Sequence, residues 1–243
     1  MASERYVAAG YLLVRPVPRP SRSSAELLPA QILSACTCLC PQFPGVHSIE
    51  WVRASEDERA RDFEAVGLAP ELRLEARHWA TSEFERSLGW PGMFLRTEDA
   101  LAARSRFFAP ASAPVALGLA LPEARLDAFL AEASPPPPAP GYAPQGESGF
   151  LTVARRREPL AAGHRPLGFE LLELAAGQIG CSWLCNGLES HFASALGVRP
   201  GPNGLLSTLA DAERCCASLD AGEVGAEPGP WLPWLLVEYP ESP

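Results

Sequence analysis

Four consecutive prolines interrupt the chain within the stretch SPPPPAPG at 134–141. Such a run favours an extended polyproline II conformation and cannot continue a helix. Polar and glycine-containing sequence prolongs this interruption to residue 149. We therefore expect a proline-rich loop or linker over 134–149, between an N-terminal α/β portion over 1–133 and a C-terminal portion over 150–243. A surface loop within one continuous domain is favoured over a linker, because each portion alone would have a small core.

The N-terminal portion combines strand and helix signals. Residues 6–14 (YVAAGYLLV) are rich in aromatic and β-branched side chains and end shortly before Pro16, as expected of a strand. Ser55 and Glu58 have the spacing of a capping box and Gly67 stands at a helix stop, which predicts a helix over 55–66. Further helices are expected over 70–88, 97–107 and 122–133. Strands are expected over 48–52 and 114–120. The segment 26–40 fits either a helix or a strand.

The C-terminal portion has a ββααβ pattern. The expected elements are strands over 150–156 and 167–174, helices over 182–196 and 207–219, and a last strand over 234–239. Strands and helices do not follow a strict βαβ alternation anywhere along the chain. We therefore expect an α+β fold in which a mixed or antiparallel sheet packs with several helices.

The chain is acidic and lacks lysine. Its 243 residues carry 29 acidic and 20 basic side chains, a formal net charge of −9, and every basic one is arginine. This charge excludes a protein that binds nucleic acid through a cationic surface. P-loop NTPases, protein kinases and Schiff-base enzymes in their usual form are excluded because each needs a lysine amine. An apolar fraction of 47% excludes a disordered chain.

The start of the chain does not match a targeting signal. Its longest early apolar run, residues 6–14, is too short to span a bilayer. The seven cysteines are odd in number and unevenly clustered, unlike the paired framework of a secreted protein. These features predict a cytoplasmic protein with no membrane partner.

Cys36, Cys38 and Cys40 alternate in the sequence CTCLC and form the most conspicuous cysteine group. Alternate cysteines could present several sulfur ligands to one zinc ion. The CxxC spacing of common zinc knuckles is absent from this stretch. Packing as small buried side chains is therefore the favoured interpretation.

A second group consists of Cys181, Cys185 and His191. It could contribute to a zinc site, with a further ligand from His164 or Cys215, or supply a Cys–His nucleophile. Six residues separate Cys185 from His191, which takes them off a common helix face, so packing is favoured here too. The sequence contains no HExxH, GxSxG or glycine-rich phosphate-loop motif. We therefore predict no metal, no cofactor and no catalytic residue.

Two groups of side chains are candidates for contact with a protein partner. Glu56, Asp57 and Glu58 form an acidic cluster, although acids also favour the first turn of a helix through the macrodipole. Trp231 and Trp234 lie close together among prolines, and tryptophan is enriched at binding hot spots. The alternative for these two rings is that they close the core when the last strand docks.

Several short segments carry a resemblance to a known group of proteins. They are GFELL at 168–172, CSWLCNGLE at 181–189 and NGLL at 203–206, with ILS at 32–34 and SIEW at 48–51 in the first half. Together they resemble bacterial immunity-type proteins that are encoded beside polymorphic toxins. The resemblance implies a cytoplasmic protein that binds and blocks one toxin. It supplies no functional residue, because these segments are structural in character.

The net charge agrees with an inhibitor of this kind. A toxin domain that attacks nucleic acid presents a basic cleft, and an acidic inhibitor is attracted to such a cleft and complements it. We therefore predict an immunity protein that neutralises a cognate toxin, itself basic at its active site, by direct binding. The alternatives are a small cysteine-dependent or zinc-dependent enzyme and a non-catalytic accessory protein.

Overall fold

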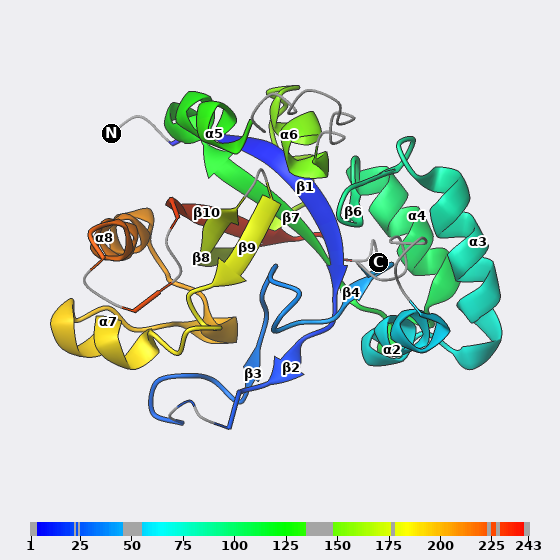
Figure 1. Ribbon diagram of the computed structural model, residues 1–243, viewed down its shortest axis with the longest axis horizontal. Coiled ribbons are helices and arrows are strands. Elements are labelled where there is room, and N and C mark those ends of the chain that lie inside the picture. Colours follow the sequence, from blue (N-terminus) through cyan, green and yellow to red (C-terminus); the bar gives the residue numbers. More distant parts are fainter. Residues whose placement is uncertain are drawn as a thin grey trace.

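A curled antiparallel sheet forms the centre of the protein (Figure 1). The computed structural model describes residues 4–21, 23, 25–45, 55–134, 148–175, 178–222, 225–226 and 229–240. The strand order is β5-β6-β1-β7-β10-β8-β9, and β4 pairs with β1. In chain order these strands are β1 Tyr6–Val14, β4 Gln42–Phe43, β5 Leu88–Gly89, β6 Met93–Phe94, β7 Val115–Pro122, β8 Arg165–Ala175, β9 Gln178–Ser182 and β10 Trp231–Glu238.

Every pair of neighbouring strands in this sheet is antiparallel. The predicted α+β class is therefore confirmed, and of the two sheet types left open the antiparallel one forms. Strands β7 and β10, from opposite sides of the proline-rich stretch, are direct neighbours. One sheet thus contains strands from both predicted portions. A separate two-stranded sheet pairs β2 (Val17–Pro18) with β3 (Gln31–Ile32).

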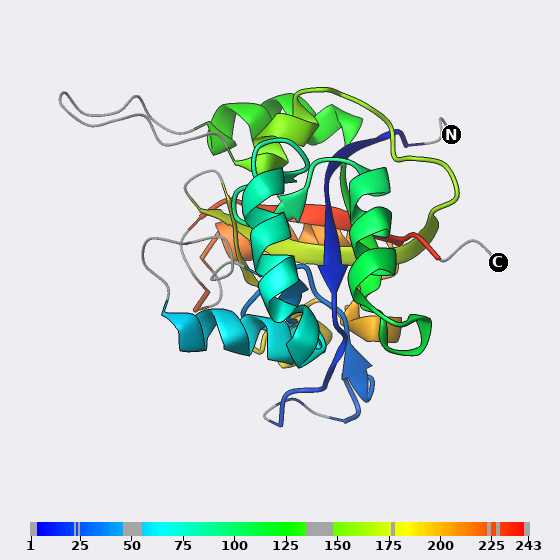
Figure 2. The same cartoon turned by 90° about the vertical axis from the view of Figure 1, so that its right-hand side faces the viewer.

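Helices cover both faces of the central sheet. They are α2 Glu56–Val66, α3 Arg73–Glu83, α4 Thr97–Phe107, α5 Leu126–Ala133, α6 Gly149–Ala154, α7 Glu189–Ala195 and α8 Leu209–Asp220. One core cluster joins the sheet to α2, α3, α4, α7 and α8, and the second joins it to α5, α6 and the turn over residues 33–40. In Figure 2, β1 is seen between the helices α3 and α4. No helix in the described ranges has the length and apolar character needed to cross a membrane.

Local signals placed several elements correctly. Strand β1 has the predicted bounds, and its buried side chains alternate between the two core clusters. Helix α2 begins at Ser55 with the predicted capping box and ends at Gly67, whose φ of 83° is left-handed. Helix α4 and the Thr208 cap of α8 are likewise as expected.

The strand predicted over 150–156 is instead helix α6. Ser148 accepts a hydrogen bond from the Leu151 amide and caps this short helix, and Phe150 and Leu151 are buried on the sheet. Six residues are too few to distinguish helical from strand periodicity, so the branched side chains alone suggested a strand. The ββααβ pattern is corrected accordingly: α6 replaces its first strand and β9 is an additional one.

Three predicted helices are shorter than expected. The helix over 122–133 begins with a 3₁₀ turn at Glu123–Arg125, and α5 follows it. The helix over 70–88 begins with a 3₁₀ turn at Pro70–Leu72 and ends at Glu83, and Leu88 lies in β5. The helix over 182–196 is confined to α7, because β9 ends at Ser182 and Gly187, with φ of 67°, lies in the intervening turn. Residues 26–40 form turns around β3. The predicted strand over 48–52 and residues 135–147 of the proline-rich stretch lie outside the described residues.

Candidate thiolate site beside a buried glutamate

A glutamate lies fully buried on the sheet face that the second core cluster covers. Glu170 is on β8, is 0% exposed and projects to the same face of the sheet as Leu172. Its carboxylate accepts hydrogen bonds from the Ser34 hydroxyl, from the Ala35 amide at 2.8 Å and from the Ser182 hydroxyl. Three donors satisfy a group that burial would otherwise make very costly.

Burial raises the pKa of Glu170 to about 7, and the hydrogen bonds from Ser34, Ala35 and Ser182 oppose this shift. The carboxyl group therefore changes its charge near neutral pH. Glu170 was not among the candidate residues predicted from the sequence. The signal that could have found it is an acidic side chain at an inward position of the otherwise apolar strand sequence GFELL.

Glu170 also holds the two turns that carry cysteines. In the first turn, the Ser34 hydroxyl that donates to Glu170 accepts from the Cys36 amide at 3.0 Å. In the second, the Ser182 hydroxyl accepts from the Leu184 amide at 3.3 Å. One carboxylate thus connects the turn after β3 to the turn after β9. The two turns come from the first and the last third of the chain.

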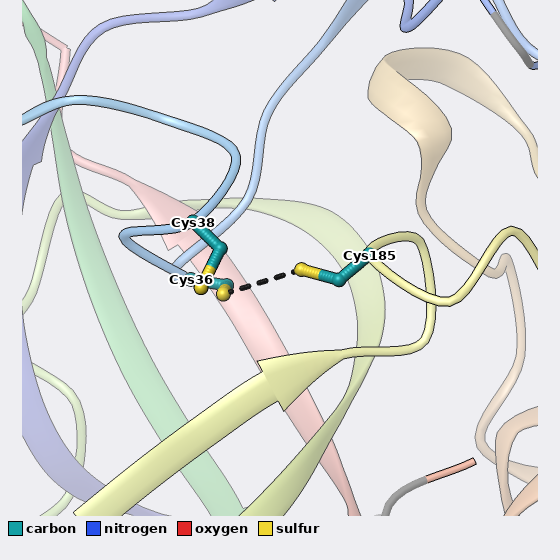
Figure 3. A group of neighbouring side chains, drawn as sticks. All are labelled: Cys36, Cys38 and Cys185. Atoms are coloured by element: carbon teal, nitrogen blue, oxygen red, sulfur yellow. Dashed lines mark hydrogen bonds between the residues drawn. The ribbon is translucent and has the colours of Figure 1, made fainter.

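Three cysteine sulfurs meet between these turns (Figure 3). The Sγ atoms of Cys36, Cys38 and Cys185 all lie within 4.8 Å of one another, and those of Cys36 and Cys185 are 3.5 Å apart. The thiols of Cys181 and Cys185 both hydrogen-bond to the thiol of Cys38, so a fourth sulfur adjoins the group. We call Cys36, Cys38, Cys181 and Cys185 the thiol cluster.

The thiols do not have the character of a nucleophile. The pKa of Cys36 is raised, first by its hydrogen bond with Cys185 and then by burial, and burial also raises the pKa of Cys38. A thiol nucleophile needs the opposite shift, because the thiolate is the reactive form. His164 lies against Tyr239, and the ring of His191 lies against Phe192.

The structure combines two cysteine groups that the sequence kept apart. Cys40, the third member of the CTCLC sequence, is fully buried, donates to the Ile32 carbonyl and has its pKa raised to about 12 by burial. Cys215 and Cys216 are buried on α8. Packing as a small apolar side chain, the interpretation favoured for the CTCLC group, describes Cys40, and Cys215 and Cys216 pack in the same way.

The acidic cluster lies where the capping box places it, on the first turn of α2. The Glu58 carboxylate accepts from the Ser55 amide at 2.7 Å and is therefore part of the cap. Glu56 has an 85% exposed side chain and lies 3.5 Å from Arg77 of α3. Asp57 is exposed. Glu56 and Asp57 are thus the members of the cluster that a partner could reach without disturbing the helix start.

Both tryptophans singled out in the sequence are core side chains. Trp231 is 2% and Trp234 is 1% exposed. The Trp234 ring packs edge-on against Phe129, with ring centroids 5.4 Å apart, and also contacts Phe150. Neither ring offers surface to a partner in this fold.

The surface of α2 and α3 does expose an apolar side chain. Leu74 of α3 is 62% exposed and is the one large apolar residue in that state within the described part of the chain. Its neighbours along α3 are ion-paired to α2, Arg73 with Glu64 at 3.8 Å and Arg77 with Glu56. We call Glu56, Asp57 and Leu74 the α2–α3 surface.

A cavity of about 380 Å³ lies between α2 and the first cysteine turn. Thr37 and Cys38 line it from the turn, and Asp62 and Ala65 line it from α2. The thiol cluster is therefore accessible from this cavity through Cys38.

No family model, no curated protein and no solved structure matches this chain. The resemblance to immunity-type proteins therefore rests on the sequence segments given above.

Proposed function

We propose that this protein is an inhibitor of the immunity type, which binds a toxin protein and covers a basic active site. The observation that carries the proposal is the uneven distribution of charge. Residues 56–86, which include α2 and α3, hold nine acidic residues and five arginines, and so account for four of the nine net negative charges. A cationic cleft would be attracted to this acidic part of the molecule and complement it.

The α2–α3 surface supplies the contact in this proposal. Glu56 and Asp57 provide exposed negative charge, and Leu74 provides an apolar side chain on the adjacent helix. Protein interfaces combine an apolar centre with a polar rim. Leu74 takes the role of apolar anchor that the sequence suggested for Trp231 and Trp234, because those two rings are buried.

The thiol cluster gives less support to the enzyme alternative. Its raised thiol pKa values keep Cys36 and Cys38 protonated at neutral pH. A Cys–His nucleophile would need a thiolate stabilised by an adjacent imidazolium. An inhibitor requires no such group.

Co-expression tests the proposal directly. The protein encoded by the adjacent gene is expressed alone and together with this protein, and cell survival is measured. We expect the neighbour to be lethal alone and harmless in the presence of this protein. A harmless neighbour, or one that stays lethal beside soluble and folded inhibitor, would contradict the proposal.

Binding kinetics then test the surface. We expect the double variant Glu56→Arg and Asp57→Arg to slow association with the toxin at least tenfold at low salt, with a smaller change in dissociation. Glu58 is left unchanged because its carboxylate belongs to the helix cap. The matched control is Glu132→Arg, a charge reversal at an exposed position of α5.

Truncation of the apolar side chain gives an independent check. We expect Leu74→Ala to accelerate dissociation of the toxin and to leave unfolding unchanged, because the side chain is already largely in solvent. Equal kinetics for wild type, Leu74→Ala and the double variant would place the interface elsewhere.

A further inference from the structure

We propose that Cys36, Cys38, Cys181 and Cys185 form a closed zinc site that joins the turn after β3 to the turn after β9. This inference is independent of the toxin partner. It replaces the expectation from the sequence that the chain binds no metal.

The spacing of the sulfur atoms suits one ion. In a tetrahedral site with zinc–sulfur bonds of about 2.3 Å, neighbouring sulfurs lie about 3.8 Å apart. The Cys36 and Cys185 sulfurs are 3.5 Å apart, and those of Cys36, Cys38 and Cys185 all fall within 4.8 Å of one another (Figure 3). Cys181 lies outside this group of three, and we assign it as the fourth ligand because its thiol hydrogen-bonds to that of Cys38.

Burial does not account for these cysteines. Cys40 and Cys215 are fully buried and need no further explanation as small apolar side chains. Cys38 by contrast is exposed, and Cys181 and Cys185 are only half-buried. Their convergence on the buried Cys36 requires another reason, and a shared metal ion provides one.

The surrounding structure holds the ligands in place before metal arrives. Glu170 fixes Ser34 beside the first cysteine turn and Ser182 beside the second. The Cys185 amide also donates to the Ser182 carbonyl at 2.9 Å. Glu170 therefore acts as a positioning residue for both halves of the site through Ser34 and Ser182, which bond to the Cys36 and Cys185 amides.

The chemistry of binding is a simple exchange of protons for metal. Four thiols bind one Zn²⁺, four S–H bonds are replaced by zinc–sulfur bonds, and four protons pass to solvent without any oxidation or reduction. An all-sulfur tetrahedral set selects a soft ion such as zinc over magnesium or calcium. With four protein ligands no position remains for substrate, so the site is structural.

A disulfide between Cys36 and Cys185 is the competing use of the same atoms. It would need an oxidant, would engage only two sulfurs, and would leave the approach of Cys38 and Cys181 unexplained. The two possibilities differ in metal content and in mass.

Metal analysis of the full chain, purified with a thiol reductant and without chelator, tests the proposal. We expect one zinc ion per chain in the wild type and in Cys40→Ala, which alters the same turn at a sulfur that faces the Ile32 carbonyl. We expect Cys38→Ser and Cys185→Ser to lose at least nine-tenths of the zinc. Wild type that contains no zinc and takes up none from added Zn²⁺ would overturn the proposal, as would full zinc in Cys38→Ser.

Alkylation of the wild type keeps the test valid if a variant fails to fold. Peptide mass mapping after treatment with N-ethylmaleimide should find Cys38 protected until a zinc chelator is added and modified afterwards. Cys38 is exposed, so protection that a zinc chelator abolishes would come from a metal ion bound to its sulfur. Modification of Cys38 without chelator, or a Cys36–Cys185 peptide two hydrogens lighter than the dithiol, would overturn the proposal.

Discussion

Glu170 makes the stability of this protein depend on pH in an unusual direction. Its pKa rises from an ordinary value of 4.5 to about 7 in the fold, mainly through burial. At pH values between these two pKa values, Glu170 has lost its proton in the unfolded chain but retains it in the folded chain. Stability therefore falls as the pH rises through this window, the reverse of the usual behaviour of a paired carboxylate.

The magnitude follows from the two pKa values. Their difference corresponds to a total loss of stability of about 3 kcal/mol, most of which falls between pH 5 and pH 8. The groups that face the carboxylate are the donors from Ser34, Ala35 and Ser182 and, nearby, the thiols of Cys36 and Cys40. Without a bound metal ion, both thiols have raised pKa values and stay protonated over this range.

Denaturant unfolding of the wild type and Glu170→Gln at several pH values, both with a reductant and a zinc chelator present, measures the effect. Glutamine keeps the shape of the side chain but cannot ionise, so its own cost does not vary with pH. The wild type should lose about 2–3 kcal/mol of stability relative to this variant from pH 5 to pH 8, since the titrations that the two proteins share cancel. A difference that stays constant over this range would refute the reasoning.

Ser34→Ala extends the same test. The Ser34 hydroxyl donates to the carboxylate and so favours its charged form. Without it the pKa of Glu170 should rise further, and the loss of stability should continue to higher pH. If stability falls over the same pH range in Ser34→Ala as in the wild type, this hydrogen bond has no effect on the ionisation of Glu170.

Three substitutions test the packing of the fold by denaturant unfolding. Trp234→Ala should cost about 3–5 kcal/mol, because it leaves a cavity beside Phe129; a cost below about 1 kcal/mol would contradict core packing. Ser148→Ala should cost about 1 kcal/mol through the lost cap of α6, whereas Ser194→Ala, at an exposed position on α7, serves as the control. Gly67→Ala should cost at least about 1 kcal/mol, because φ there is 83° and a Cβ would lie 2.3 Å from the Arg15 guanidinium. A Gly67→Ala variant as stable as the wild type would show that the helix end adjusts to the added side chain.

Elements with a complete local signal were predictable from the sequence. The capping box and terminal glycine of α2 lie within 13 residues, and all of their hydrogen bonds form inside that segment. Strand β1 has a continuous apolar sequence that suits a central strand in contact with both core clusters. The mixture of such elements without βαβ alternation was enough to assign the α+β class.

Elements with a short or mixed pattern were decided by tertiary packing. The sequence of α6 contains branched and aromatic side chains that suit a strand, yet the fold buries them as a helix against β1 and α5. The same holds for the residues after Ser182, where a turn with a left-handed glycine delays the helix until Glu189. Local preference is weak over so few residues, and burial determines the outcome.

The thiol cluster likewise depends partly on the sequence and partly on the tertiary structure. The sequence by itself provided the residue types, two closely spaced cysteine pairs with no common zinc motif. Their meeting depends on a contact between Cys36 and Cys185, 149 positions apart in the chain, and on a glutamate buried between two turns. No local pattern encodes such a contact, because it exists only once β8 and β9 have paired and the first cysteine turn has packed over them.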